Sequence, residues 1–573
     1  MKQIKYIICA FCVICGFASC LDLDPQDQIG GDKMWATESD FKNFANNFYG
    51  WLPDFSSVYN DGSPHSDSRS DILTYQTPNV FSHGSNTVPE NDGNYTGNYA
   101  HIRRCNLLLE NAESYSNKDA IKQYVGEAYF FRAWSHFELV QLYGDVVIVK
   151  DVLDLNSREL TAPRDNRSDV IDFVIEDLNN AIDNLSSAAN ITEEGRVSKE
   201  AAQAFLSRVA LFEGTWQKFH FKNTSRANEL FTIAANAAKK VIDGGRFQLF
   251  GTTGNSIALG TTAQKYLFIL ENDLSNPAKC TKADNKEYIL ARRHDTTLYP
   301  IGKDITAQCV NNPQWITRNF AQLYLCSDGL PITKSSRFQG YANKNSEFQN
   351  RDNRMRNNLL MPGTRYWKCF SFPRVNWEEG NYENSQEYNG QNGSGYNNQK
   401  WGAERACDSG SEGYDWPVIR YAEVLLNYAE AIFERDGSIS DADLDYSLNL
   451  VRLRVNPEMP KLSNGLVNSN GLSMREEIRR ERTVELYQEG FRIDDLKRWA
   501  TAVEVMSQPL LGVKYTGTEF QSSGWNGSNL PKNGEGCLIL DQDRTWTEKN
   551  YLLPIPSKQL ELNPQLKQNI GWE

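Results

Sequence analysis

Two carboxylates in a charged segment are the residues best placed for acid–base chemistry. Residues 479–499 read RRERTVELYQEGFRIDDLKRW, and a helix would set Glu485 and Glu489 on one face, four residues apart. Such a pair could act as acid and base in glycoside hydrolysis. The segment also alternates acidic and basic residues at helical spacing, which is the pattern of ion pairs along and between helices. We favour the ion-pair interpretation, because alternating charge of this kind is commoner in scaffolds than in active sites.

Sequence motifs for other catalytic and metal-binding chemistry are missing. The six histidines include no H-x-H or H-x-x-x-H pair, and there is no G-x-S-x-G elbow or phosphate-binding glycine loop. Residues 441–445, DADLD, begin like a calcium loop, but Tyr446 and Arg452 stand where such a loop needs Gly and Glu. We therefore expect no metal, no cofactor and no catalysis.

Aromatic residues interleaved with polar ones point to binding instead. They lie in the loop-like segment 53–98 and in residues 315–401, where 15 of 87 residues are Phe, Trp or Tyr. Aromatic rings can stack on the C–H faces of sugars, while Asn, Gln, Asp and Arg side chains bond their hydroxyls. The alternative is that these rings fill a second core or cover the helices, and for any single ring that alternative is favoured.

Helices must carry these candidate regions. Thr37 with Asp40, and Ser473 with Glu476, fit capping boxes at two helix starts. Small and large residues alternate along 198–245, which lets antiparallel helices approach closely, as in tetratricopeptide hairpins, although no clean repeat copy recurs. Periodic apolar residues predict helices at 37–52, 99–112, 120–144, 168–185, 198–215, 225–245, 416–435, 441–455 and 473–500.

The predicted fold class is all-α: a tetratricopeptide-like helical repeat scaffold with a large, irregular, loop-rich ligand-binding insertion. The helical repeats are expected mainly at 99–245 and 416–500, the irregular binding regions at 53–98 and 246–415, and a C-terminal tail at 550–573. Pro554, Pro556 and Pro564 predict that the tail is laid across the body rather than folded as one long helix.

The N-terminus predicts export and a lipid anchor. Lys2 and Lys5 precede an apolar run at 7–17 that is too short to span a bilayer, followed by small residues, as in a secretory signal. Cys20 directly follows Ala-Ser and resembles the lipidated cysteine of a bacterial lipobox, with an ordinary signal peptide as the alternative. We predict a signal peptide at 1–19, a lipidated N-terminus and tether at 20–36, and the body at 37–573.

The bulk composition limits the classes of partner. The chain has 573 residues, is 40% hydrophobic and 23% charged, and carries a net charge of −13. An acidic chain without a basic stripe argues against nucleic acid and against anionic membrane surfaces as partners. The cysteines of the body are widely spaced and odd in number, so no disulfide framework can be deduced, and buried thiols explain them equally well.

Several segments, in this order, resemble the SusD/RagB family of outer-membrane nutrient-binding lipoproteins. The resemblance spans most of the chain, and the set is specific although no single segment is decisive. The segments are SCLDLDP, GEAYFFRAWSHFELVQLYGDV, IRYAEVLLNYAEA, ERTVELYQEGFRIDDLKRW and LLPIPSKQLELNPQLKQNIGW.

The resemblance implies a non-catalytic cell-surface lipoprotein. It would capture glycans at the outer membrane and deliver oligosaccharides to a SusC-like, TonB-dependent barrel, onto which it docks like a lid. A helical-repeat receptor for peptides remains an alternative, as does, less favoured, a glycoside hydrolase with a carboxylate pair.

The resemblance also implies where the ligand binds. The family places binding residues near a W-x-x-N motif, which here reads YTGN, so Tyr95 and Asn98 are implied as ligand-binding residues. The remaining candidates come from the two aromatic and polar regions: Asp71, Tyr75, Trp315, Tyr324, Trp367 and Trp377.

Overall fold

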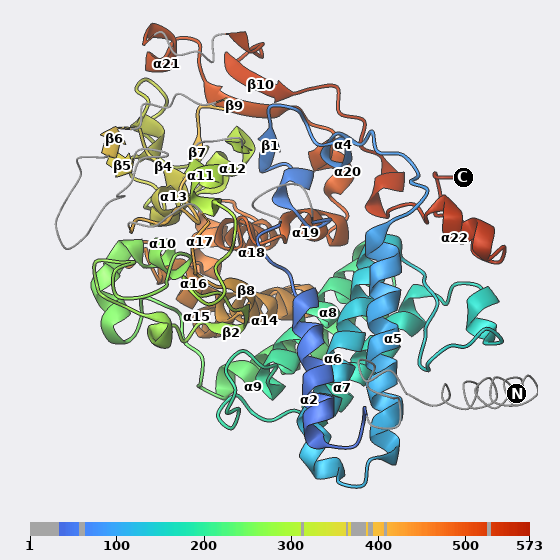
Figure 1. The fold of residues 1–573 in the computed structure, drawn as a ribbon. Helices are drawn as coiled ribbons and strands as arrows, with labels where there is room; N and C mark the ends of the chain where they lie inside the picture. The colour runs from blue at the N-terminus through green and yellow to red at the C-terminus, as the bar shows by residue number, and fades with distance from the viewer. Residues whose placement is uncertain are drawn as a thin grey trace, which may run out of the picture.

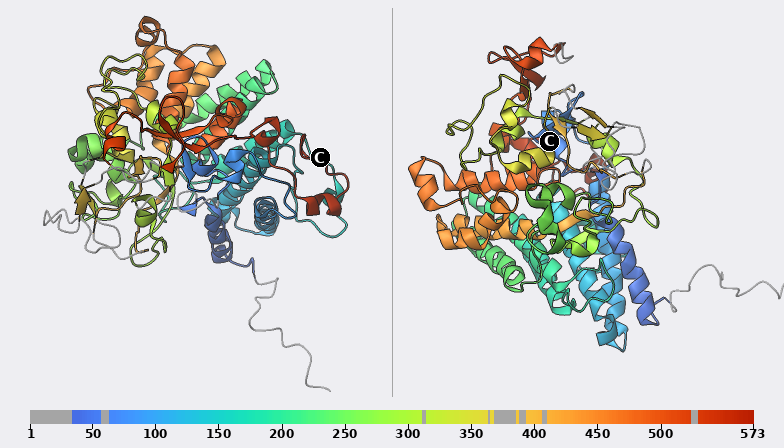
Figure 2. Two further views of the ribbon diagram at one scale, coloured as in Figure 1. Left: turned by 90° about the horizontal axis from the view of Figure 1, so that it is seen from above. Right: turned by 90° about the vertical axis from the view of Figure 1, so that its left-hand side faces the viewer.

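The computed structural model divides into a helical part and an irregular part. It describes residues 34–56, 63–310, 314–362, 365–367, 385–387, 393–405, 410–523 and 529–573. The predicted signal peptide, Cys20 and most of the tether lie outside the described residues. Figures 1 and 2 show long helices gathered on one side, with short helices and strand pairs on the other.

Long antiparallel helices build the first half of the body, as predicted. Helices α5 and α7 both pack on α6, and α8 packs on α9, which in turn contacts α14. These elements are α2 (Glu38–Asn46), α5 (Gly93–Ser114), α6 (Lys118–Tyr143), α7 (Arg167–Asn184), α8 (Lys199–Phe219), α9 (Thr224–Asp243) and α14 (Tyr421–Asp436).

Local chemistry fixes where these helices start and how closely they pack. The N-cap side chains of Asp92, Asn117 and Ser198 each accept a backbone N–H from the first turn of α5, α6 and α8. A Cβ atom added to Gly126 would lie 2.8 Å from Leu185, and one added to Gly214 would lie 2.7 Å from Phe231. Small residues therefore allow the close approach of helices that the sequence predicts.

Short helices follow in the irregular region and in the C-terminal third. The irregular region contains α10 (Ala263–Leu267), α11 (Ile305–Val310), α12 (Arg318–Leu323) and α13 (Asn353–Asn358), and α4 (Val80–His83) precedes α5. The C-terminal third contains α15 (Asp441–Tyr446), α16 (Leu448–Leu453), α17 (Asn464–Ser469), α18 (Met474–Glu485), α19 (Arg492–Arg498), α20 (Ala502–Met506), α21 (Glu519–Ser522) and α22 (Ser557–Leu562).

Five antiparallel strand pairs are found among the described residues. They join β1 (Leu73–Tyr75) to β3 (Gln314–Ile316), β2 (Tyr288–Arg292) to β8 (Trp416–Arg420), and β9 (Leu510–Lys514) to β10 (Cys537–Asp541). The last two pairs join β4 (Leu359–Leu360) to β7 (Asn397–Asn398) and β5 (Arg365–Trp367) to β6 (Ser385–Glu387). The pairs are too small to form a layer, so the all-α prediction is confirmed.

Several predicted helix boundaries were wrong. Helix α5 starts at Gly93 instead of residue 99, inside the segment 53–98 that was predicted to be irregular. Residues 416–420 form strand β8, because Pro417 disfavours a helical conformation at Trp416, and α14 starts only at Tyr421. The segment 473–500 breaks between α18 and α19, where Gln488 and Gly490 adopt left-handed backbone conformations with φ of 55° and 82°. The segment 441–455 divides at Ser447 into α15 and α16.

Two hydrophobic cores hold the body together. The larger lies among the long helices. The smaller lies in the irregular part and includes Phe320, Tyr324, Tyr396 and Tyr487, so the aromatic residues of that region do fill a second core. The C-terminal tail returns to the long helices, where Leu553 donates its N–H to the Leu142 carbonyl over 2.7 Å (Figure 1).

Candidate ligand-binding site

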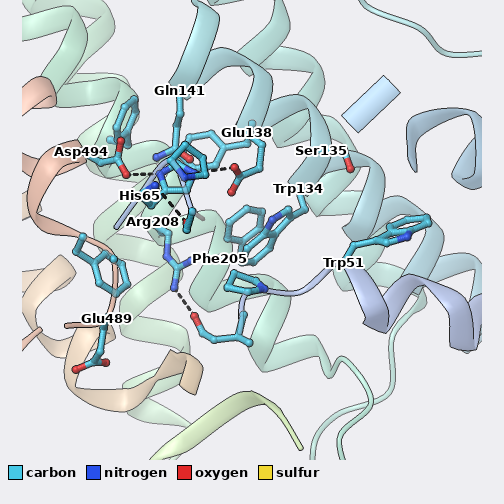
Figure 3. Close-up of a pocket in the computed structure, with 18 of the residues that line it drawn as sticks. Trp51, His65, Trp134, Ser135, Glu138, Gln141, Phe205, Arg208, Glu489 and Asp494 are labelled. Atoms are coloured by element: carbon cyan, nitrogen blue, oxygen red, sulfur yellow. Dashed lines mark hydrogen bonds and ion pairs between the residues drawn. The ribbon is translucent and has the colours of Figure 1, made fainter. Parts of the chain in front are cut away.

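A cavity of about 270 Å³ lies where the long helices meet the turn between α18 and α19 (Figure 3). One side comes from the first turns of α5 and from α6, and another comes from α8. The short helix η2 (Asn47–Trp51), which follows α2, brings Trp51 to the rim. Its size is near the lower end of small-molecule sites, so it suits one compact group.

Aromatic rings form much of the cavity wall. Trp51 stacks on His101 with ring centroids 4.1 Å apart and an interplanar angle of 14°. Trp134 stacks on Phe205 at 4.4 Å and 16°, and both rings also belong to the larger core, at 7% and 1% exposure. Burial lowers the pKa of His101 to about 4, so its ring is neutral near pH 7. The polar residues Asn94, Asn98, Ser135 and Gln141 also line the cavity.

His65 closes another part of the wall by bridging α6 and α19. Its Nδ1 lies 2.5 Å from Asp494 Oδ2 and its Nε2 lies 2.8 Å from Glu138 Oε2 (Figure 3). Burial lowers the pKa of His65, but the two carboxylates outweigh it and raise the pKa to about 10. His65 is therefore a cation that donates from both nitrogens, and it has no free lone pair with which to act as a base.

The chain segment that carries His65 is tied down at two further points. The backbone N–H of Gln488 donates to Asp67 Oδ2 over 2.6 Å. Arg492 donates to both carboxylate oxygens of Asp71, at 2.7 and 3.0 Å. The α18–α19 turn thus positions this wall, which is why its left-handed residues matter for the site.

Glu485 and Glu489 each form ion pairs with basic side chains near the cavity. Glu485 is fully buried and lies 2.7 Å from Arg420 and 2.5 Å from Arg454. Burial raises the pKa of Glu485, but the arginines outweigh it and lower the pKa to about 2, the opposite of what a general acid needs. Glu489 borders the cavity and accepts from Lys400 and Arg420 at 2.7 and 2.6 Å. The geometry supports the ion-pair interpretation.

Of the predicted binding residues, Asn98 lines the cavity. Tyr95 lies one turn earlier on α5, but its ring is only 4% exposed and packs against Tyr99 and Tyr143. Asp71 is buried and serves the supporting segment through Arg492. Their part in binding stays a prediction.

The other candidates lie away from the cavity or outside the described residues. Tyr75 and Trp315 sit on the paired strands β1 and β3 and pack against the second core. Tyr324 is fully buried, and its hydroxyl accepts a hydrogen bond from Asn358 over 2.9 Å, so its ring belongs to that core and offers no open face. The side chain of Trp367 and all of Trp377 lie outside the described residues.

Sequence reasoning missed most of the residues that surround the cavity. Trp51 and Trp134 lie in the predicted helices 37–52 and 120–144, where an apolar residue is equally the signal of a core position. His65 and Glu138 are 73 residues apart, and no motif joins them. The one usable signal was Asn98, through its family motif.

A second aromatic surface lies next to the cavity. Tyr299 is 54% exposed, and its ring stacks on His294 with centroids 5.2 Å apart and an interplanar angle of 11°. His294 Nε2 lies 3.1 Å from Asp54 Oδ1, and Asp54 also lines the cavity. Asp54 therefore links the cavity to this exposed aromatic ring.

The described residues show no arrangement for a metal and no membrane-crossing helix. No three of their His, Cys, Asp or Glu side chains are grouped so that they could hold an ion. Their helices are all too short or too polar to cross a membrane.

Comparison with known families and proteins gives consistent matches. A model of the SusD family matches residues 275–572, and a model described as "Starch-binding associating with outer membrane" matches residues 22–211. SusD-like protein P38 of Formosa agariphila is 24% identical over 259 residues, which are 41% of this chain and 48% of that protein. A SusD-like protein of Bacteroides ovatus is 28% identical over 128 residues, 22% of this chain and 23% of its own length. The matched regions thus span less than half of these relatives.

Solved structures share the fold over nearly the whole chain. A SusD-like protein of Bacteroides fragilis superposes with a TM-score of 0.72 at 22% identity, covering 96% of this chain and 99% of that one. A SusD-like carbohydrate-binding protein of the same species gives 0.71 at 21% identity, covering 93% and 100%.

Proposed function

The chain belongs to the SusD family, and we propose that it captures glycans at the cell surface in the cavity beside Trp51. One observation carries this proposal: a cavity whose wall combines stacked aromatic rings with amide and hydroxyl side chains. Rings bind the apolar faces of a sugar, and the polar groups orient its hydroxyls. A structural relative that is described as carbohydrate-binding supports the choice of ligand.

The proposed role is binding without catalysis. The cationic state of His65 and the low pKa of Glu485 leave these two groups unsuited to act as base or acid. A captured sugar would be released unchanged.

We also propose that the protein is anchored by a lipid on Cys20 and passes its ligand to a SusC-like, TonB-dependent barrel. The signal-like N-terminus and the outer-membrane association in the matching family description support this location. The partner follows from the family resemblance.

Replacing Trp51 tests the site. Because Trp51 supplies an aromatic face at the rim, Trp51→Ala is expected to weaken glycan binding at least about tenfold, within the range for loss of a stacking aromatic anchor. Affinity electrophoresis of the purified body against neutral polysaccharides, followed by titration calorimetry on those that bind, measures the effect. Phe221→Ala is the matched control, since Phe221 is 55% exposed and lies outside the cavity lining.

Three outcomes would contradict the proposal. Equal loss in both variants would remove the site assignment. Release of shorter sugars from a bound glycan would show a hydrolase. Capture of peptides with no binding to any glycan would favour the peptide receptor instead.

Replacing Cys20 tests the anchor. Cys20→Ala is expected to move the protein from the membrane fraction to the soluble fraction while glycan binding persists, because the lipid is attached there. Fractionation in a strain without the barrel partner separates lipid anchoring from retention by that partner. Membrane retention of the variant in that strain would refute the anchor.

A further inference from the structure

We propose that this cavity selects uncharged glycans over anionic ones. The inference rests on the proposed function and names the substrate class of the same site. It follows from how the charged side chains of the cavity wall are paired and from which of them face the cavity.

Each cation of the described wall already has a carboxylate partner. Arg208 donates to both oxygens of Glu423 at 2.6 and 2.7 Å. Arg482 and Arg498 both donate to Asp495, at 2.9 and 2.8 Å, and Arg498 also pairs with Glu430. His65 is shared between Glu138 and Asp494. A glycan carboxylate would therefore compete with partners that are already in place.

The more exposed charges of the wall are acidic. The side chain of Asp54 is 29% exposed and that of Glu138 is 18% exposed. The arginine side chains are more deeply set, at 14% for Arg208 and 2% for Arg498. His65, whose side chain is 16% exposed, stands between Glu138 and Asp494 and is neutralised by them. An entering anion thus meets Asp54 and an already paired cation, whereas a hydroxyl can still accept from, or donate to, the same groups.

The remaining charges near the wall do not reverse this balance. Lys497, which lies beyond the lining residues, interacts with Asp494, and Arg292 pairs with Asp54 at 3.1 Å. Like charges a few ångströms apart in a partly buried site repel strongly. Burying a glycan carboxylate here would also remove its water without a compensating partner.

Matched pairs of glycans test the selectivity. Soluble starch, a galactomannan and a β-glucan are each compared with the same polymer after oxidation of its C6 hydroxyls to carboxylates. The oxidised form is expected to bind at least about tenfold more weakly than the neutral form. A tenfold change in affinity corresponds to about 1.4 kcal/mol of binding free energy. The difference in affinity between the neutral and the oxidised polymer should become smaller at about 0.5 M salt, where charge repulsion is screened.

Two matched variants separate the cavity from the acidic surface as a whole. Glu138→Gln is expected to raise the ratio of oxidised to neutral binding at least about threefold, because it removes a wall carboxylate and keeps its shape. Glu113→Gln removes the same charge from an exposed position near the opposite end of α5, and the ratio should stay at the wild-type value. Circular dichroism verifies that both variants are folded before their binding is compared.

The possible results are distinct. Oxidised glycans that bind wild-type protein as tightly as neutral ones, or more tightly, overturn the selectivity and leave glycan capture standing. Equal shifts in Glu138→Gln and Glu113→Gln also overturn it, because they would place the effect on the whole surface. A wild-type protein that binds no glycan in either form removes the proposed function itself.

Discussion

Two groups of charged residues, a buried one below the cavity and a half-open one in its wall, differ in what surrounds them. In the buried group, Glu287, Glu481, Glu485 and Asp352 meet Arg354, Arg420, Arg452 and Arg454. All eight side chains are at most 2% exposed, and acids and arginines match in number. In the wall group, His65, Glu138 and Asp494 are 10–18% exposed and stand beside aromatic rings.

The comparison shows that residue type alone does not identify a site. The buried group holds Glu485, one of the two carboxylates that could have formed an acid–base pair, yet its arginines lower the pKa of Glu485 to about 2 and its side chain is closed off from solvent. The residues of the wall group are far apart in the sequence and follow no motif, but they line a cavity that also has apolar walls. A binding site therefore differs from a scaffold less in its density of charge than in being open to solvent and lined by apolar surface that no other side chain covers.

Removing one carboxylate from the buried group should have the largest effect. Glu485→Gln keeps the side-chain shape but removes one of the countercharges of Arg420 and Arg454, which then keep Glu287, in a dry interior. We expect a loss of about 3–5 kcal/mol in the free energy of unfolding, the range for a broken buried ion pair. Chemical denaturation monitored by circular dichroism measures it.

Glu476→Gln is the matched control for that change. Glu476 lies on the same helix, but its side chain is 61% exposed and 3.9 Å from Arg479. Its loss should cost less than about 1 kcal/mol, as for other surface pairs. Similar costs in both variants would show that the buried group does not stabilise the fold more than a surface pair.

His65→Gln should have a smaller effect that depends on pH. The pKa of His65 is raised to about 10 by its carboxylate neighbours, above its value of 6.5 in the unfolded chain. Its contribution to stability is therefore complete below about pH 6.5 and lost as pH rises through about 10. Wild-type protein should lose up to about 4 kcal/mol more than the variant between pH 6.5 and 10, since each unit by which the pKa is raised corresponds to about 1.4 kcal/mol.

Denaturation midpoints across this pH range, compared between the two proteins, provide the measurement. Other groups that titrate there, such as Lys400, are present in both proteins and cancel in the difference. A difference between the proteins that stays constant with pH would mean that His65 is not charged in the folded wall.

Most long helices could be predicted from sequence, because the residues that determine a helix lie within the helix or directly beside it. Apolar spacing and N-cap residues such as Asn117 and Ser198 fix α6 and α8 within a few residues. The break before α19 was missed, because Gly490 can sit inside a helix pattern, whereas here it takes a left-handed conformation beside His65. Strand β8 was missed because its five residues are all buried and carry no alternating pattern.

The site was less predictable than the fold. Asn98 was found through a motif, but its neighbour Tyr95 turned inward to pack on Tyr143. Whether an aromatic ring faces a cavity or a core depends on contacts from distant segments, and the sequence pattern is the same in both cases.

By itself the sequence determined the helical scaffold, the acidic character of the chain and its family, since all of these depend on local patterns of polarity, charge and motif. Only the tertiary structure decided which charges are neutralised and which rings stay accessible. His65 meets Asp494 across 429 residues of chain, and Arg208 meets Glu423 across 215. Electrostatics and burial act through space, so the wall of a binding cavity exists only after the helices have packed.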